Sequence, residues 1–154
     1  MSKPKVAVIS GFGINCELET MAAFEMAGAS ADRVHVNRLV NGESNLEDYQ
    51  IMAVPGGFSF GDHLGSGRLM GNRLRFGLRE QVTEFVKAGK LVIGICNGFQ
   101  VLVKMGLLPG DAEVSLTQTA SLALNDSGHY ENRWATLEFD PDSPCIWTRG
   151  ISRM

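Results

Sequence analysis

Short apolar runs and amphipathic stretches alternate along the chain as far as Gly106. The apolar runs are rich in valine and isoleucine and lead into turn-forming residues, which is typical of buried strands. They predict four strands, at residues 5–10, 34–40, 49–57 and 90–96. Apolar residues at helical spacing, ended in each case by a glycine, predict three helices, at residues 17–28, 72–88 and 97–106.

The order of these elements indicates an α/β fold. Helical crossover connections between strands favour a mostly parallel sheet with helices on both faces. From Glu113 onward, "AEVSLTQTASLAL" and "YENRWATLEF" alternate without helices, which predicts an antiparallel extension at the edge of the sheet. The residues from Pro141 onward show no strand or helix pattern that would finish such a sheet, so we expect an incomplete C-terminus.

The composition predicts a single domain over residues 1–154, because 44% of the residues are hydrophobic and 20% are charged. A formal net charge of -3 offers no basic surface for nucleic acid or an anionic membrane. The N-terminal residues hold no apolar run long enough for a signal peptide or a membrane span. Cys16, Cys96 and Cys145 are too widely spaced for a disulfide framework or a metal site, so we expect a cytoplasmic protein without a metal.

The segment "GICNGFQ", residues 94–100, places a cysteine between two glycines where a buried strand should end. The glycines permit a sharp turn from strand to helix that lifts Cys96 above the edge of the sheet. The helix N-terminus favours a thiolate, and the backbone N–H of Asn97 is directed towards an oxyanion. A second donor is expected from the loop "PGGFSFGD" at 55–62. The pattern predicts acyl transfer by a thiol nucleophile.

Cys96 also has a second interpretation. Free cysteines are often small buried hydrophobic residues without a chemical role. The two flanking glycines and the glycine-rich loop after the preceding strand favour the nucleophile.

These segments resemble a known family. "GICNGFQ" is similar to the nucleophile segment of class I glutamine amidotransferases. "PGGFSFGD" narrows the resemblance to the glutaminase components of phosphoribosylformylglycinamidine synthases, which belong to purine biosynthesis. "VAVISGFGINCELET", "GSGRLMGNRLR" and "NDSGHYENRW" resemble further segments of that family in the same order. The resemblance covers most of residues 4–150 and implies a flavodoxin-like fold.

The resemblance also implies roles for individual residues. Cys96 would attack the side-chain amide of glutamine, forming a glutamyl thioester and releasing ammonia. The backbone N–H groups of Gly57 and Asn97 would form the oxyanion hole. The residues that would help to hold glutamine are Phe58, Ser59 and Gln100.

Partners follow from the same resemblance. Ammonia would pass to a large synthetase subunit, which uses ATP and magnesium to aminate formylglycinamide ribonucleotide. A small third subunit often completes the complex in this family. The chain itself would carry no cofactor or metal, and it would bind neither nucleic acid nor a membrane.

The base that this chemistry needs is not evident in the sequence. The family uses a His-Pro-Glu motif near its C-terminus, and neither that motif nor the family's His-Gly-Glu-Gly segment occurs here. His129 and Glu131 have a similar spacing, but they fall in the segment that resembles the family's Asn-x-Ser-Gly stretch, where no triad member is expected. His63 is interpreted as a solvated loop residue. The base is therefore expected beyond the end of this chain.

Two alternatives stay open. The first is a catalytically silent, truncated module that keeps only the binding of glutamine or of the synthetase partner. A His-Pro-Glu segment following Met154 in the gene would argue against it. The second is a different cysteine hydrolase of the same fold, with a histidine directly after the cysteine. Asn97 occupies that position, which counts against this second alternative.

Overall fold

The computed structural model describes residues 2–153 of the 154-residue chain. The chain divides into two compact units, and the first unit ends at Leu122. The first unit holds the sheet and all the α-helices of the described residues, so it is the unit that positions the candidate site.

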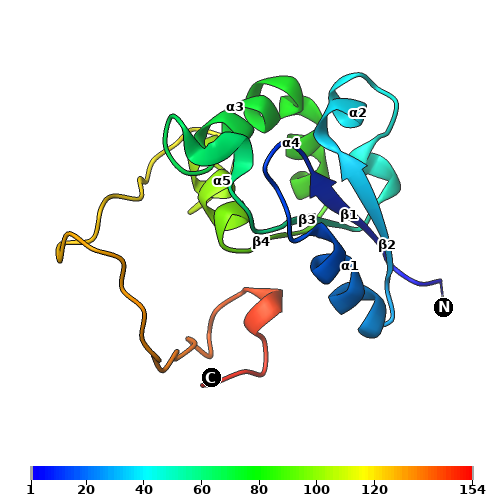
Figure 1. The fold of residues 1–154 in the computed structure, drawn as a ribbon. Coiled ribbons are helices and arrows are strands. Elements are labelled where there is room, and N and C mark those ends of the chain that lie inside the picture. The colour runs from blue at the N-terminus through cyan, green and yellow to red at the C-terminus, as the bar shows by residue number, and fades with distance from the viewer. Residues whose placement is uncertain (1, 154) are drawn as a thin grey trace. The chain divides into compact units, whose positions relative to one another are not determined.

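A four-stranded parallel sheet forms the centre of the first unit (Figure 1). Its strands are β1 Lys5–Ser10, β2 Ser30–His35, β3 Ile51–Val54 and β4 Leu91–Gly94. They lie in the order β2-β1-β3-β4, and each neighbouring pair is parallel. The register places Val6 of β1 between Ala31 of β2 and Ile51 of β3. The predicted α/β class with a mostly parallel sheet is confirmed.

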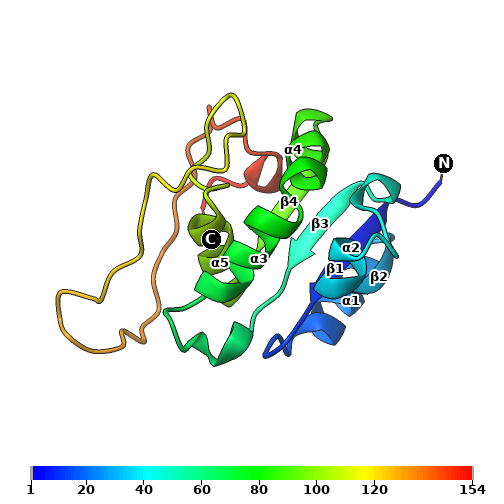
Figure 2. The same ribbon diagram turned by 90° about the horizontal axis from the view of Figure 1, so that it is seen from above.

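Helices cover the sheet (Figures 1 and 2). They are α1 Glu17–Met26, α2 Val36–Val40, α3 Arg68–Gly77, α4 Arg79–Lys87 and α5 Asn97–Met105. Figure 1 shows α1 on one side of the sheet and α3 and α4 on the other. Short 3₁₀ turns at Leu46–Asp48 and Ser59–Asp62 lie before and after β3. Across residues 2–153, no helix is long and apolar enough to span a membrane.

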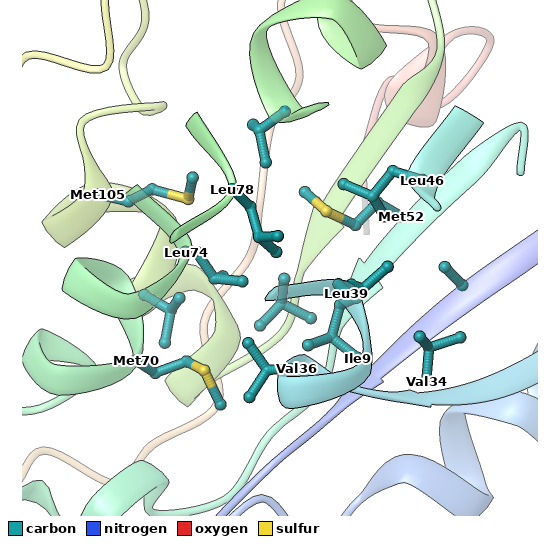
Figure 3. Close-up of a cluster of buried hydrophobic side chains, with 14 of the residues drawn as sticks. Ile9, Val34, Val36, Leu39, Leu46, Met52, Met70, Leu74, Leu78 and Met105 are labelled. Carbon is teal, nitrogen blue, oxygen red and sulfur yellow. The ribbon is translucent and has the colours of Figure 1, made fainter. Parts of the chain in front are cut away.

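The hydrophobic core lies where the central strands meet these helices (Figure 3). Strand β3 is buried along its whole length, as is β1 after its first residue, which is typical of central strands in a covered parallel sheet. Ile9 and Met52 from these strands share one buried cluster with Leu39 of α2, Leu74 of α3 and Met105 of α5. This cluster fixes the strands whose carboxyl ends carry the candidate site.

The strand predicted at 34–40 is wrong for residues 36–40, because β2 begins at Ser30 and ends at His35, and a helix follows. Val36 and Leu39 are both fully buried, and their separation of three residues is a helical spacing. The side chain of His35 caps this helix, since its Nδ1 accepts a hydrogen bond from the Asn37 N–H at 3.1 Å. The apolar run is therefore divided between a strand and a helix.

The single helix predicted at 72–88 is two helices in the structure. The chain leaves helical geometry at Leu78, where φ is -129° and ψ is 21°, and α4 begins at the next residue. Leu74, Leu78 and Val82 are all buried in the core. Because the apolar spacing continues across the break, the sequence pattern does not reveal it.

Neither segment predicted as an antiparallel extension forms a strand, so that prediction is wrong. Of residues 113–139, Glu138 alone joins a strand-like pair, as an isolated bridge to Arg153. The second unit otherwise contains the 3₁₀ turn Ile146–Thr148. Alternation shows which side chains could share a face, but a strand also needs a hydrogen-bonded neighbour. Within residues 2–153, no strand of the sheet pairs with these segments.

Candidate active site

Three loops meet beyond the carboxyl ends of the central strands. In Figure 2, the chain leaves β1 and β3 at the same end of the sheet. The backbone N–H groups of Asn15 and Cys16, in the loop after β1, both donate to the carbonyl oxygen of Gly56 at 3.3 Å. The loop after β4 carries Cys96, whose Cβ lies next to the same glycine. Ligands of open parallel sheets bind at this edge, so the meeting point is the candidate site.

Cys96 occupies a strained turn between β4 and α5. Its φ of 53° and ψ of -114° lie in a region that residues with a side chain rarely adopt. It is the N-cap residue of α5, and its side chain is exposed. A strained turn that presents a nucleophile at the start of a helix is the geometry of a nucleophile elbow. The predicted sharp turn between strand and helix is therefore present at Cys96, and its role as a nucleophile stays a prediction.

The two glycines around Cys96 are required by close backbone contacts. A Cβ atom on Gly98 would lie 1.8 Å from the carbonyl oxygen of Val54, at the end of β3. A Cβ atom on Gly94 would lie 2.7 Å from the carbonyl oxygen of Gly98. The elbow therefore packs directly on the backbone of the neighbouring strand, and only glycine fits at either position.

Gly57 is held opposite the loop after β1. It forms an isolated antiparallel bridge with Ile14, flanked by a hydrogen bond of 2.7 Å from the Phe58 N–H to the Gly13 carbonyl oxygen. In this type of bridge, the N–H of Gly57 points away from Ile14. Its φ of 148° favours glycine, and a Cβ atom at this position would lie only 2.6 Å from the Gly13 oxygen. The backbone amide is thus free of the bridge that fixes its position.

The side chain of Asn97 joins the elbow to the loop after β3. Its Oδ1 accepts a hydrogen bond from the Ser59 N–H at 3.0 Å. Its Nδ2 donates to Asp62 Oδ1 at 3.2 Å and to Gln100 Oε1 at 3.0 Å. Asn97 is 1% exposed, so these bonds form in a buried environment where they are hard to replace with water. Asn97 therefore fixes the position of the loop relative to Cys96.

Asp62 anchors the far end of that loop. Its carboxylate accepts hydrogen bonds from the Gly67 N–H at 3.3 Å and from the Ser66 hydroxyl at 3.2 Å. The loop is strained, because Phe60 and Asp62 have φ values of 53° and 54°. Such conformations persist only where surrounding interactions hold them. The Asp62 and Asn97 side chains supply those interactions.

A pocket of about 430 Å³ opens beside the elbow, a size suited to a small ligand. Of the predicted site residues, Gly57, Phe58 and Cys96 line it. The pocket lining does not include Asn97, Ser59 or Gln100, among the residues that the structure describes. Ser59 is 1% exposed, and its hydroxyl is buried without a hydrogen-bond partner among residues 2–153.

One wall of the pocket comes from a segment that the sequence reasoning did not assign to the site. This wall is formed by Asn15, Cys16, Glu19, Thr20 and Ala23. All of them follow the carboxyl end of β1, the strand next to β3 in the sheet. The sequence could have indicated these residues by their position directly after a predicted central parallel strand, because loops at the carboxyl ends of such strands form binding sites.

The sequence also suggested His129 and Glu131 as a substitute for the histidine and glutamate of the family's His-Pro-Glu motif. His129 Nε2 lies 3.6 Å from Glu131 Oε1, and its Nδ1 is 2.9 Å from the Ser127 carbonyl oxygen. Both residues belong to the second unit. His63 is exposed in the loop after β3, in agreement with its interpretation as a loop residue. Within residues 2–153, no group of three or more His, Cys, Asp or Glu could hold a metal ion.

Comparisons with known proteins identify the family. The sequence matches the CobB/CobQ-like glutamine amidotransferase domain over residues 3–154. A Dehalococcoides mccartyi protein named phosphoribosylformylglycinamidine synthase subunit PurQ is 47% identical over 154 residues, which are 100% of this chain and 60% of that protein. A Methanococcus maripaludis protein of the same name is 45% identical over 149 residues, covering 97% of this chain and 54% of that protein.

The solved structure of PurLQS from Thermotoga maritima contains a similar chain. The two chains share 32% sequence identity and a TM-score of 0.67, over 88% of this chain and 55% of that one. This chain spans about half the length of the curated relatives it matches. The resemblance predicted from the motifs is confirmed by these matches. Since the family match extends over nearly the whole sequence, the chain belongs to the family of CobB/CobQ-like glutamine amidotransferase domains.

Proposed function

We propose that Cys96 forms a thioester with the side chain of glutamine in the pocket beside the elbow. The observation that carries this proposal is the strained backbone of Cys96 at the N-terminus of α5, beside Gly56 and in the lining of the same pocket as Gly57. By its similarity to the PurQ proteins, the whole protein is the glutaminase component of a phosphoribosylformylglycinamidine synthase. Its role is to supply ammonia for purine biosynthesis.

The reaction begins with attack by the Cys96 sulfur on the amide carbon of glutamine. A carbon–sulfur bond forms, and the carbonyl oxygen becomes an oxyanion. The backbone N–H groups of Gly57 and Asn97 stabilise that oxyanion, as preorganised donors do in acyl transfer. The carbon–nitrogen bond then breaks, and the nitrogen leaves as ammonia after taking up a proton. Water later hydrolyses the thioester to glutamate.

The roles of the predicted glutamine-binding residues differ with their positions. Phe58 lines the pocket, so it is the one of these residues that we propose to contact glutamine directly. Ser59 and Gln100 lie behind Asn97 and bond to its side chain, so they hold the elbow and the loop in register. In this arrangement they are positioning residues.

The remaining features follow the family resemblance. Ammonia passes to a large synthetase subunit that uses ATP and magnesium, and this chain contributes no cofactor of its own. A small third subunit completes the complex, as the PurLQS assembly of Thermotoga maritima suggests. All of residues 1–154 belong to one amidotransferase domain, and the protein is cytoplasmic.

A catalytically silent module is the second candidate function. It is favoured by one observation: the pocket lining includes no histidine among the described residues. Deacylation needs a general base, and the family takes it from a His-Pro-Glu motif that this sequence lacks. Under this alternative the chain binds glutamine or its partner without turning it over.

The test is to detect the thioester directly. The 154-residue chain is mixed with glutamine, quenched with acid and digested with trypsin. The mass of the peptide from Leu91 to Lys104 is then measured by mass spectrometry. We expect a glutamyl adduct on Cys96 with glutamine and none with asparagine or in a Cys96→Ala variant. Glutamate release is measured in parallel, with and without the large synthetase subunit. No adduct and no release under either condition would support the silent module.

Replacing His129 with alanine is expected to leave the yield of this adduct unchanged. His129 lies in the second unit and bonds to Ser127 and Glu131 of the same unit. The measurement is the acylated fraction of Cys96 at a fixed time, with Glu131→Gln as the matched variant. Slower release of glutamate together with a larger acylated fraction in both variants would instead make this pair the base for deacylation.

A further inference from the structure

We propose that Cys16 and Cys96 form a reversible disulfide when the chain meets a peroxide, which makes the pair a site of oxidative modification. The two residues lie 80 positions apart in the sequence, at the starts of α1 and α5. The inference needs only these side chains and their surroundings, so it does not depend on glutamine chemistry.

The two cysteines converge on one glycine. Gly56 has no side chain, and the position that its Cβ would occupy lies 3.5 Å from the Cβ of Cys96 and 3.6 Å from the Sγ of Cys16. Both cysteines therefore border the same small space, which Gly56 leaves open. A disulfide needs two Cβ atoms about 3.5–4.5 Å apart, so the proposal requires the side chains and loops to close the remaining gap around Gly56.

Neither cysteine side chain is held in place by a capping hydrogen bond. Cys16 and Cys96 are the N-cap residues of α1 and α5, and neither side chain makes a capping hydrogen bond. Serine, threonine, aspartate and asparagine are the residues that satisfy helix N-termini well, and cysteine is not among them. The Cys16 thiol donates a hydrogen bond of 3.4 Å to Asn15 Oδ1, which is weak and local. Both side chains can therefore rotate without loss of a cap.

The pair is also accessible to a small oxidant. Cys96 is exposed, Cys16 is partly exposed, and both line the pocket of about 430 Å³. Thiols in such positions are the ones that peroxides reach, and a neighbouring thiol converts the first oxidation product into a disulfide.

The chemistry balances with hydrogen peroxide as the oxidant. The Cys96 thiolate attacks one peroxide oxygen, the oxygen–oxygen bond breaks, and hydroxide leaves, giving a sulfenic acid. The Cys16 thiolate then attacks the Cys96 sulfur, a sulfur–sulfur bond forms, and the second hydroxide leaves. With the two thiol protons, both hydroxides become water. The sulfurs together lose two electrons and the peroxide gains them, so a dithiol reductant reverses the change.

Peptide mapping tests the proposal. The folded chain is treated with hydrogen peroxide, blocked with iodoacetamide and digested with trypsin without reduction. We expect the peptide of residues 6–33, which contains Cys16, joined to the peptide of residues 91–104, which contains Cys96. Dithiothreitol should separate the two peptides. Sulfinic acid on Cys96 beside an unmodified Cys16 would overturn the proposal.

Cys145 provides the matched control, because it is the third thiol of the chain. It is exposed, and its pKa is lowered by hydrogen bonds from the Trp147 backbone N–H and the Thr148 hydroxyl, so it competes with the pair for the oxidant. Cys145→Ser should leave the yield of the joined peptides unchanged. Pairing of Cys145 with Cys96 in the folded wild-type chain would contradict the inference.

A second variant tests the geometry. Alanine at Gly56 would place a methyl group between the cysteines at ordinary contact distances, 3.5 Å and 3.6 Å, so the chain should still fold. We expect disulfide formation in Gly56→Ala to slow about tenfold. The added methyl group would keep the two sulfur atoms apart, and a displacement of about 1 Å between reacting groups strongly reduces the rate of a positioned reaction. Circular dichroism confirms folding. An unchanged rate in the folded variant would show that the cysteines do not meet across Gly56.

Discussion

Alanine in place of Gly98 is expected to reduce the free energy of unfolding by about 3 kcal/mol or more. The added Cβ would lie 1.8 Å from the carbonyl oxygen of Val54 and 2.9 Å from that of Pro55. Both are backbone atoms at the end of β3, so no side-chain rotation can relieve the overlap. The elbow and the start of α5 must move away from the sheet. Urea denaturation measures the effect as a lower midpoint.

Gly77→Ala is the matched control for this substitution. Gly77 also lies in a helix, but a Cβ atom there would first meet the Val40 side chain, at 3.0 Å. A small movement of Val40 relieves this contact, and alanine is the better helix former by about 1 kcal/mol. We therefore expect a change of no more than about 1 kcal/mol. Equal losses in the two variants would mean that backbone contact does not explain the requirement for Gly98.

Replacing Asp62 with glycine is expected to slow the acylation of Cys96 by glutamine about 100-fold, the size of effect seen when one oxyanion-hole donor is lost. Glycine accepts the left-handed conformation of this position, where φ is 54°, so the main loss is the carboxylate. Without it, Asn97 Nδ2 and the Gly67 N–H lose an acceptor. The loop that carries Gly57 then loses its anchor. Quenched samples taken over time measure the acylation rate.

Asp62→Asn separates the anchor from general damage to the fold. Its side-chain oxygen can still accept from Asn97 and Gly67, and asparagine tolerates a positive φ, so we expect acylation close to that of the wild type. Alkylation of Cys96 by iodoacetamide needs no oxyanion hole and should be equal in all three proteins. If the glycine variant lost alkylation and acylation alike, Asp62 would have a structural role alone.

The sequence predicted the strands and helices that carry their own local signals. The apolar run at 5–10 matches β1, whose residues after the first are all buried. The helix predicted at 17–28 matches α1, which ends two residues before Gly28. In both elements, the prediction follows directly from residue type and spacing, so no knowledge of the neighbours was needed.

The errors occurred where a neighbour decides the structure. β2 is an edge strand that begins with polar residues such as Ser30 and Asp32, so the pattern placed it too late in the chain. The turn at Leu78 keeps that residue in the core and so preserves the apolar spacing. The alternation of apolar and polar residues after Glu113 shows which side chains could share a face, but it does not identify a partner strand. Strand pairing and chain reversal depend on distant residues, and a local pattern does not contain them.

The candidate site was predictable in part for the same reason. Cys96 could be found because its neighbours, Gly94 and Gly98, mark the elbow in the sequence itself. The inward orientation of the Asn97 side chain, and its bonds to Ser59 and Asp62, depend on a loop more than 30 residues away. Contacts between residues so distant in sequence leave no local pattern.

The strand order β2-β1-β3-β4 has a consequence for how the chain assembles during synthesis. β1 and β2 emerge first and can pair at once. β3 then joins the free edge of β1, and β4 joins the free edge of β3. Within residues 2–153, no strand has to insert between two that are already paired, so this part of the sheet can grow outward as the chain leaves the ribosome. Cys96 follows β4, the last strand within residues 2–153 to be synthesised, so the four strands that support its turn are made before the turn itself.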